Sequence, residues 1–346
     1  MHTLDLGTGN TSLRPISDLP EAVQPCFSFT KSQLELSLTD PNIADLVANK
    51  TASKEFFYGI EIMAHNEGKI TCVDFNLFLP LLPTFVSIVW SRQFSESIRS
   101  STMKQVASMQ LIPYLNSHIS AMPHLSLYRL SEKLLDEFLA LNFTNVLVVR
   151  GDQTHDDQEY KYAYQVVEYL RRARGDKISI AVGGYPEGYT SLTTEPQDKV
   201  QNIRFLKRKV DAGANFIISQ LCYSGDKIVE FIRDARSGGI TVPILIGMVV
   251  PDSFGKYENL EKITGVRLPP EERDELEKIQ YDNNKVKDFF VQLTVRNIQH
   301  VMDVGLGIYG IQFFTLNRFE SVLDVLRELR TRNILKEPST GNSVEA

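Results

Sequence analysis

A carboxylate lies inside the first strongly apolar run of this chain. Glu61 is the only charged residue of FFYGIEIM. A polar group placed in an apolar interior without a hydrogen bond costs roughly 2–7 kcal/mol, and burial also raises the pKa of a glutamate towards neutrality. Glu61 is therefore a candidate general acid for chemistry near neutral pH.

Other polar residues lie near the ends of later apolar runs. They are Arg150, Gly151 and Asp152 after VLVV, Tyr185 after AVGG, Gln220 in FIISQLCY, and Thr315, Asn317 and Arg318 after IQFF. If these runs are parallel strands of a barrel, their carboxyl ends meet on one rim, which is where barrel enzymes hold their active sites. So many polar groups on one rim favour an enzyme.

The elements that must position these residues are eight apolar runs separated by helical patterns. The runs are Phe56–Met63, Phe85–Ser91, Gln110–Asn116, Asn145–Gly151, Ile178–Pro186, Phe216–Tyr223, Pro243–Val250 and Gly307–Asn317. Their nearly continuous hydrophobicity is typical of strands buried on both faces. Apolar residues with helical spacing predict helices over Ser131–Leu141, Asp198–Ala212, Asp226–Arg236, Lys285–Met302 and Phe319–Arg330.

This alternation predicts a parallel sheet with helical crossovers, and eight strands favour a closed (β/α)₈ TIM barrel over residues 51–333 as a single domain. The rival architecture is an open, doubly wound sheet. The first run is not followed by the GxGxxG motif of dinucleotide-binding folds, which argues against that rival. We expect residues 1–50 to form an irregular N-terminal extension and residues 334–346 a disordered tail.

Composition excludes several classes of protein. The net charge of −6 gives no basic surface for nucleic acid, and no apolar stretch approaches the 18 residues of a membrane span. The three cysteines and six histidines form no metal-binding spacing and no disulfide framework, so we expect no metal site. The N-terminus does not resemble a secretory signal. We expect a cytoplasmic protein with a small-molecule substrate, which could form a homo-oligomer.

Four segments of the chain carry a family resemblance. VVRGDQ, YPEG, LKRKVDAGANFIISQ and FFTLNR occur in the same order and at similar spacing in methylenetetrahydrofolate reductases, and the chain resembles this family from about Phe56 to Arg330. The resemblance implies an eight-stranded barrel that holds FAD non-covalently at the carboxyl ends of its strands. It also implies a ping-pong reaction of one-carbon metabolism, in which NAD(P)H reduces the flavin and 5,10-methylenetetrahydrofolate is then reduced to 5-methyltetrahydrofolate.

The resemblance also assigns roles to individual residues. Glu61 matches the family's general acid, Asp152 matches an aspartate beside the flavin and the pterin, and Gln220 and Arg318 match residues that bind folate. The residues matched to flavin contacts are Tyr114, Arg150, Gly151, Asp152, Tyr162, Ala163, Tyr185, Tyr189, Asn202 and Lys209.

Some positions depart from the family pattern. IEIMAHN stands where the family has FEFFPPR, Val89 replaces a threonine, and Tyr189 replaces a histidine. Asn202 replaces an aspartate, unless a gap in the alignment brings Asp198 to that position.

The family's PHLT segment has two possible matches. IPYL lies in the predicted third strand and puts Tyr114 in place of the histidine, whereas PHLS keeps His124 but falls in a predicted loop. We favour the strand register, and thus Tyr114.

Two other functions compete with the reductase. The departures would suit a non-catalytic relative that binds folate or a partner protein without flavin. An unrelated barrel lyase or aldolase would need a Schiff-base lysine at a strand end, and none of the eight runs ends with one.

Overall fold

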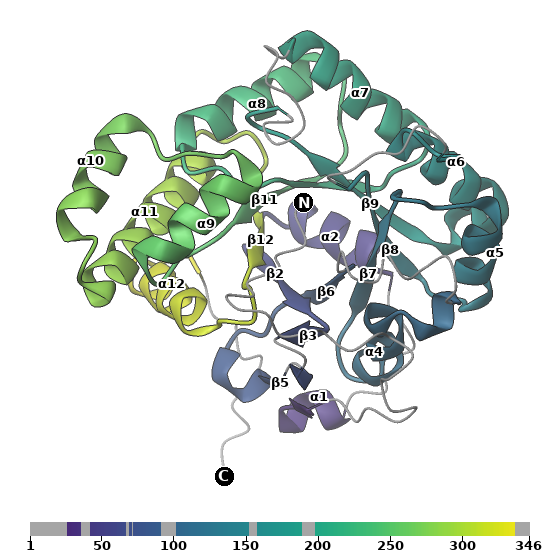
Figure 1. Cartoon of the computed structure of the whole chain (residues 1–346), viewed down its shortest axis with the longest axis horizontal. Helices are drawn as coiled ribbons and strands as arrows, with labels where there is room; N and C mark the ends of the chain where they lie inside the picture. Colours follow the sequence, from purple (N-terminus) through teal and green to yellow (C-terminus); the bar gives the residue numbers. More distant parts are fainter. Residues whose placement is uncertain are drawn as a thin grey trace.

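Eight parallel strands close into a barrel in the computed structural model, which describes residues 26–35, 42–66, 69–70, 72–90, 102–151, 158–188 and 198–335. Around the barrel the strands follow the order β10-β11-β12-β2-β6-β7-β8-β9. Their bounds are β2 Phe57–Met63, β6 Phe85–Val89, β7 Ala121–Ser126, β8 Asn145–Val149, β9 Ser179–Gly184, β10 Phe216–Ser219, β11 Ile244–Met248 and β12 Gly310–Phe314. The predicted (β/α)₈ barrel is confirmed (Figure 1).

Helices surround the strands (Figure 1). They are α4 Ala107–Asn116, α5 Glu132–Ala140, α6 Ala163–Arg174, α7 Lys199–Asp211, α8 Gly225–Ser237, α9 Phe254–Thr264, α10 Pro270–Ile279, α11 Asn283–Asp303 and α12 Glu320–Thr331. The five helices predicted from apolar spacing correspond to α5, α7, α8, α11 and α12. Among the described residues, none of the helices combines the length and the apolar character needed to cross a membrane.

The predicted third strand is wrong. Gln110–Asn116 belongs to helix α4, and the strand is β7, from Ala121 to Ser126. Within α4 the buried residues Leu111, Ile112 and Leu115 have helical spacing, while Tyr114 is 48% exposed. Because β7 pairs with β6 and β8, His124 lies in the barrel wall and Tyr114 lies outside it.

The region expected to be irregular, residues 1–50, contains ordered elements among its described residues. The short strand β1 (Cys26–Ser28) and helix α1 (Lys31–Glu35) precede helix α2 (Ile43–Ala52). The first turn of α2 donates backbone hydrogen bonds from Ile43 to the Asn145 side chain at 2.7 Å and from Ala44 to Ser179 at 3.0 Å. Asn145 and Ser179 begin β8 and β9, so α2 covers the amino-terminal end of the barrel.

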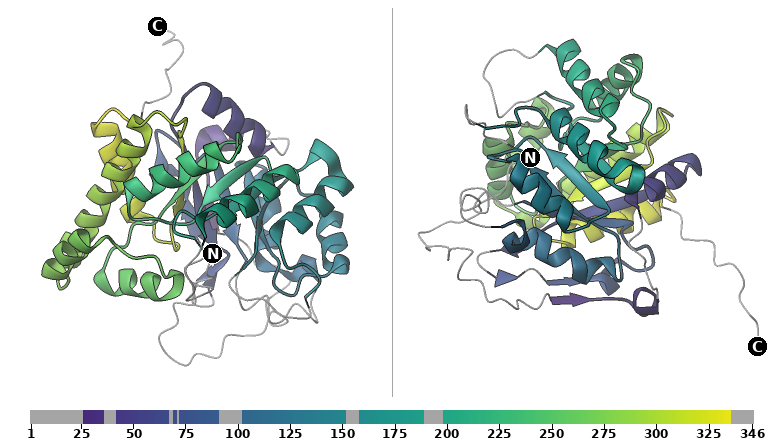
Figure 2. Two further views of the ribbon diagram at one scale, coloured as in Figure 1. Left: turned by 90° about the horizontal axis from the view of Figure 1, so that it is seen from above. Right: turned by 90° about the vertical axis from the view of Figure 1, so that its right-hand side faces the viewer.

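Among the described residues, no α-helix connects β2 to β6. The chain there forms a small hairpin, β3 (His65–Asn66) with β4 (Lys69–Ile70), then β5 (Cys72–Asp74) and a 3₁₀ helix, η2 (Phe75–Phe78). β5 pairs in parallel with β1, and the Phe29 and Phe75 rings stack at 5.4 Å. This small sheet lies at the side of the barrel away from α7 and α8 (Figure 2).

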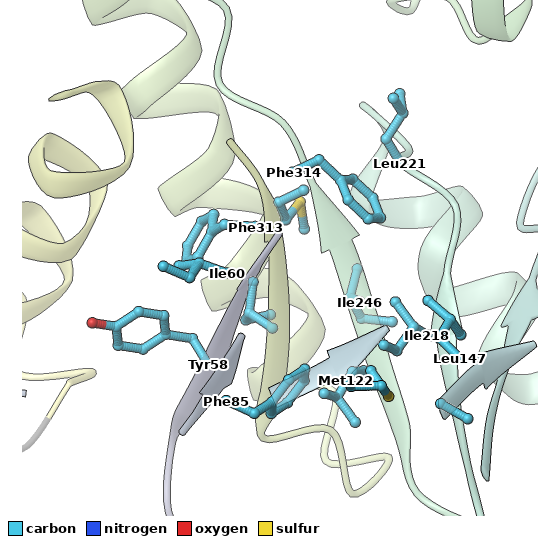
Figure 3. Packing of buried hydrophobic residues seen from close by; sticks show 14 of the residues in the cluster. Tyr58, Ile60, Phe85, Met122, Leu147, Ile218, Leu221, Ile246, Phe313 and Phe314 are labelled. Carbon is cyan, nitrogen blue, oxygen red and sulfur yellow. The ribbon is translucent and has the colours of Figure 1, made fainter. Parts of the chain in front are cut away.

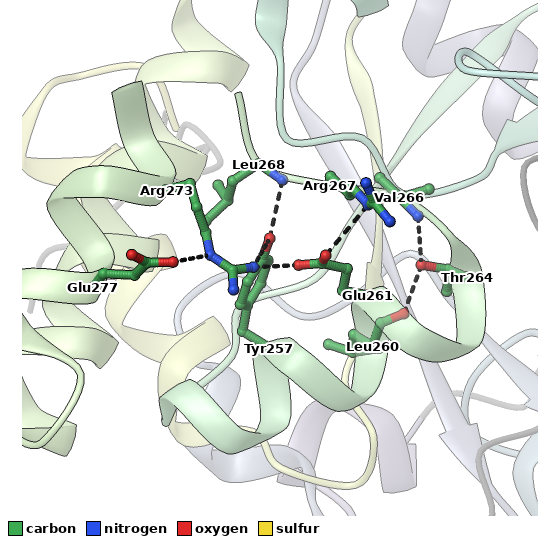
Figure 4. Close-up of polar contacts among 9 residues, drawn as sticks. All are labelled: Tyr257, Leu260, Glu261, Thr264, Val266, Arg267, Leu268, Arg273 and Glu277. Carbon is green, nitrogen blue, oxygen red and sulfur yellow. Dashed lines mark hydrogen bonds and ion pairs between the residues drawn. The ribbon is translucent and has the colours of Figure 1, made fainter. Parts of the chain in front are cut away.

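A polar network fixes the excursion that follows β11. The Arg273 side chain on α10 contacts Glu261 and Tyr257 of α9, and it donates a 2.8 Å hydrogen bond to Glu277 (Figure 4). The Tyr257 hydroxyl also accepts a 3.2 Å hydrogen bond from the Leu268 backbone. These contacts hold α9 and α10 together before α11 returns to the barrel.

Side chains along β2 alternate between the barrel interior and the surrounding helices. Tyr58 and Ile60 lie on the side of the helices with Phe313, whose ring is 5.9 Å from that of Tyr58 (Figure 3). Gly59 therefore faces inwards, where a Cβ would stand 2.5 Å from the Phe85 ring. By the same two-residue period, Glu61 points into the barrel.

The C-terminal tail begins as part of the barrel. Leu335 is buried against the core. The rest of the tail predicted over residues 334–346 lies outside the described residues.

Replacing Gly247 tests the packing between β10, β11 and β12. A Cβ on Gly247 would stand 2.2 Å from the Ser219 carbonyl oxygen and 2.5 Å from the Phe314 ring, so Gly247→Ala requires a backbone shift. We expect it to lower the free energy of unfolding by roughly 2–3 kcal/mol in urea denaturation.

The matched control is Gly255→Ala in α9, where a Cβ meets no atom within 4 Å. Alanine favours the helix there, so stability should stay equal or rise by about 0.5–1 kcal/mol. Equal stability of the two variants would contradict the close packing described for Gly247.

Candidate active site

Glu61 and His124 face each other inside the barrel, near the carboxyl ends of β2 and β7. The carboxylate Oε2 lies 3.5 Å from the imidazole Nε2, and both side chains are buried. Neither atom has a hydrogen-bond partner in the described part of the chain. A polar group of a bound molecule could therefore satisfy both atoms.

The apolar surroundings keep both side chains uncharged. Burial raises the pKa of Glu61 to about 8 and lowers the pKa of His124 to about 3. At neutral pH the pair is thus a carboxylic acid next to a neutral imidazole, which is not a charged ion pair. A protonated carboxyl group in this position can donate a proton.

Backbone contacts hold the strand end that carries Glu61. The Thr315 hydroxyl donates a 2.6 Å hydrogen bond to the Glu61 carbonyl, and the Asn317 side chain contacts the Met63 backbone at 2.9 and 3.2 Å. Thr315 and Asn317, two of the polar residues that end the last apolar run, therefore join β12 to β2. Their observed contacts are structural.

A cavity of about 300 Å³ lies where β8 and β9 meet α6 and α7. Its walls contain Val148, Val149, Arg150, Tyr162, Ala163, Tyr164, Gly183, Tyr185, Asp198, Gln201, Asn202, Phe205 and Lys209. Six of the residues predicted to bind flavin are in this set: Arg150, Tyr162, Ala163, Tyr185, Asn202 and Lys209. The structure thus brings them together around one space.

Lys209 provides a buried cation in the wall of this cavity. It lies on α7, its ammonium group donates to the Gly183 carbonyl, and it stands 5.5 Å from the centre of the Tyr185 ring. No described carboxylate pairs with it, and burial lowers its pKa to about 7. An anionic group entering the cavity would compensate this poorly solvated cation.

Flat aromatic surfaces form another part of the cavity wall. The Tyr162 ring is stacked between Tyr164 at 5.7 Å and Phe205 at 5.6 Å, and the Arg208 guanidinium lies 3.8 Å from the centre of the Tyr164 ring. The Gln165 side chain accepts hydrogen bonds from the backbone just before α6 and so fixes the approach to Tyr162. This arrangement suits a planar, anionic molecule.

A smaller cavity shares part of its wall with the larger one. It is lined by Leu147, Val149, Gly183, Gly184, Tyr185, Ile218 and Gln220, three of which also line the larger cavity. His124 is the neighbour of Leu147 in the β7–β8 register. Gln220 therefore lies beside the larger cavity, and Glu61 and His124 lie inside the same barrel near the carboxyl ends of β2 and β7.

The turns around this region bring neighbouring segments of the chain close together. Gly151 has a φ of +80°, and a Cβ there would stand 2.8 Å from the Ser126 hydroxyl, so only glycine fits easily. Glu187, in the YPEG turn, pairs with Lys227 of α8 and accepts a 3.5 Å hydrogen bond from Cys222. Glu187 thereby ties the loop after Tyr185 to the loop after Gln220.

Four predicted site residues are not part of this assembly as described. Tyr114 lies on the exposed face of α4, so its predicted flavin contact is wrong. Arg318 follows β12, is half exposed and stands 3.8 Å from Asp252 in the loop after β11. Asp152 and Tyr189 lie outside the described residues.

The sequence prediction missed Tyr164, Phe205 and Gln201 as wall residues and placed His124 in a loop. For Tyr164 the signal was its place in YKYAY, directly after the predicted flavin contacts Tyr162 and Ala163. For His124 the signal was the PHLS motif itself, which the apolar run at Gln110–Asn116 outweighed.

A model of the family described as methylenetetrahydrofolate reductase matches residues 47–330. The chain belongs to this family. A methylenetetrahydrofolate reductase of Schizosaccharomyces pombe is 27% identical over 71% of this chain and 41% of its own length. A probable methylenetetrahydrofolate reductase (NADPH) of Caenorhabditis elegans is 28% identical over 57% of this chain and 30% of its own length. This member of the family thus spans less than half the length of these relatives.

A solved structure shares the fold. An uncharacterized protein from Clostridium thermocellum, described as binding two copies of 5-methyl-5,6,7,8-tetrahydrofolic acid, has a TM-score of 0.55 and 14% identity. The similarity covers 84% of this chain and 99% of that protein. At this identity the likeness supports the barrel fold of the reductase family.

The buried Lys209 gives a prediction for the ligand-free protein. The pKa of this lysine is about 7 in the folded chain and 10.5 as a free group, so between these values the unfolded chain binds the extra proton. Lys209 should therefore make the protein more stable as pH rises from about 7 to 10.5. In thermal unfolding, Lys209→Met should be more stable than the wild type at pH 7, and the gap should close with rising pH.

The control for loss of a lysine is Lys207→Met, on the same helix, which removes a surface ion pair with Asp211. If the difference in melting temperature between the wild type and Lys209→Met is the same at every pH, Lys209 does not have the lowered pKa of a buried lysine without a charged partner.

Proposed function

We propose that this protein is a flavin-dependent reductase that uses NAD(P)H to reduce 5,10-methylenetetrahydrofolate to 5-methyltetrahydrofolate. The observation that carries the proposal is one barrel that combines the buried, protonated Glu61 with a cavity walled by a buried lysine and stacked aromatic rings. Family membership supports the same reaction, and the Clostridium thermocellum protein shows that a barrel of this shape can bind a reduced folate.

The residues of the larger cavity fit FAD. Lys209 and Arg150 would face its phosphates, and Tyr162, Ala163, Tyr185 and Asn202 would line its rings and ribityl chain. Gly151, with its positive φ, would allow the backbone to approach the cofactor. Asp152 and Tyr189 belong to the proposal as further contacts by family resemblance. Bound FAD would supply a two-electron carrier between NAD(P)H and the folate.

The chain's own contribution to folate reduction is a proton. Glu61 would donate it from its carboxyl group to the folate nitrogen that bears the methylene bridge, which opens the five-membered ring for hydride addition. His124 is neutral and its Nε2 lies 3.5 Å from Oε2, so it would hold the carboxyl group in position and leave the carboxyl proton for the folate. Gln220 lines the small cavity together with Tyr185, and by the resemblance it would bind the pterin.

Arg318 would bind the opposite end of the folate. Its guanidinium lies near Asp252 and is half exposed, so a glutamate-tail carboxylate could replace or share this partner through two parallel hydrogen bonds. Asp152 would act beside the flavin and the pterin, as the resemblance implies.

One observation favours a second function, in which the protein binds folate without flavin. Val89 ends β6 with an apolar side chain where the family has a threonine, so this position offers no hydroxyl to a cofactor. Purified protein without the visible absorption of an oxidised flavin, which still binds 5-methyltetrahydrofolate, would support this alternative over the reductase.

Glu61→Gln separates the two half-reactions. The amide cannot donate the proton, so methyltetrahydrofolate formation should fall by about 10²–10⁴-fold, while flavin reduction by NAD(P)H persists. Stopped-flow absorption follows each half-reaction separately. In the wild type, folate reduction should decline as pH rises through about 8, because Glu61 then loses its proton. If both half-reactions survive in the variant, Glu61 is not the acid.

Arg318→Ala should weaken folate binding by about tenfold without changing the flavin content. Arg318→Lys keeps the charge but loses the two-pronged geometry, and its affinity should lie between those of the wild type and the alanine variant. Folate titration and the ratio of flavin to protein absorption measure the two effects. Loss of flavin in either variant would give Arg318 a structural role.

A further inference from the structure

Two exposed cysteines face each other on the small sheet beside the barrel. In the parallel pairing of β1 with β5, Cys26 is the direct partner of Cys72. Both are exposed, whereas Cys222 is buried and contacts Glu187. In each strand the middle residue is the least exposed, so Cys26 and Cys72 project from the same solvent-facing side of the sheet.

The geometry permits a bond between the two sulfur atoms. Adjacent strands lie about 4.8 Å apart, which falls within the roughly 4.4–6.8 Å that disulfides require between Cα atoms. Cys26 and Cys72 are direct partners in this register, so their side chains start close together. Little backbone movement is therefore needed to join them.

The sheet that carries the cysteines is a weak part of the structure. Each strand has three residues, and an isolated two-stranded pair of this length is barely stable in water. It nevertheless occupies the connection between β2, the strand of Glu61, and β6. A covalent link from Cys26 to Cys72 would close the chain segment that contains α2 and β2.

We propose that Cys26 and Cys72 are a redox modification site, a dithiol that a small-molecule disulfide oxidises reversibly to a disulfide bond that locks β1 onto β5. The Cys26 thiolate attacks one sulfur of the small-molecule disulfide and releases one thiol, which leaves a mixed disulfide on Cys26. The Cys72 thiolate then attacks the Cys26 sulfur and releases the second thiol. The protein loses two electrons and two protons, and one disulfide is reduced to two thiols.

Both cysteines of the pair are exposed to a reagent in solution. The buried Cys222 is shielded from the same reagents, and burial raises its pKa to about 12.

The test uses the full chain equilibrated with mixtures of reduced and oxidised glutathione, followed by acid quenching and alkylation. Oxidation should remove two of the three alkylatable thiols, and proteolysis should yield one cross-linked peptide pair containing Cys26 and Cys72. Dithiothreitol should restore both thiols. The melting temperature should rise by roughly several degrees on oxidation, because the bond restrains the unfolded chain.

Two variants control for other reactions. Cys222→Ser should form the same cross-link as the wild type, whereas Cys26→Ser should end with glutathione attached to Cys72 and no rise in melting temperature. Glutathione on both cysteines of the wild type, or only dimers linked between chains, would overturn the proposal. A cross-link that leaves the melting temperature unchanged would overturn the locking of β1 onto β5.

Discussion

The burial of one carboxyl group against one imidazole constrains the rest of the site. Water is largely excluded from the barrel interior around Glu61 and His124, so neither side chain can hold a charge cheaply. The barrel tolerates the pair because each group takes its neutral form near pH 7. Burial therefore keeps the Glu61 carboxyl group protonated up to about pH 8.

Besides Glu61 and His124, the structure contains another buried ionisable side chain without an oppositely charged partner among the described residues. Lys209 is buried in the wall of the larger cavity with a backbone carbonyl as its acceptor and no described carboxylate partner. Glu61 and Lys209 thus lie in different parts of the barrel, Glu61 inside it opposite His124 and Lys209 in the wall of the larger cavity. Gln220 and Tyr185 line the small cavity, which shares part of its wall with the larger one.

The sequence predicted most of the fold because buried parallel strands leave a strong local pattern. Seven of the eight expected strands overlap observed strands, from β2 at Phe57 to β12 at Phe314, and the helices with clear apolar spacing are all present. The third strand was wrong because prolines gave a misleading signal. Pro113 lies inside helix α4, where proline is unfavourable, and Pro123 lies in β7, where it removes a backbone donor. The choice between Tyr114 and His124 depended on this strand, so Tyr114 was favoured although His124 is the residue that lies in the barrel wall.

Other parts of the site depend on tertiary contacts that a local pattern does not contain. The stacking of Tyr162 on Phe205 joins residues 43 positions apart, and the distance between Glu61 and His124 depends on two strands separated by a third in the barrel. Spacing in the sequence could place each residue on the rim, but only barrel closure decides which side chains meet. Family resemblance supplied that information for Lys209, Tyr185 and Asn202, and the described cavity contains all three.

Helix α2 covers the amino-terminal end of the barrel, opposite the site. Its first two backbone amides donate hydrogen bonds to the side chains of Asn145 and Ser179, and its own side chains Ile43 and Val47 are fully buried. Asn42, the residue that caps this helix, therefore belongs with the barrel. A fragment that begins at β2 would lack α2 and would expose the amino-terminal end of the barrel to water. A loss of activity in such a fragment would come from a destabilised fold, because the site lies at the opposite end of the barrel.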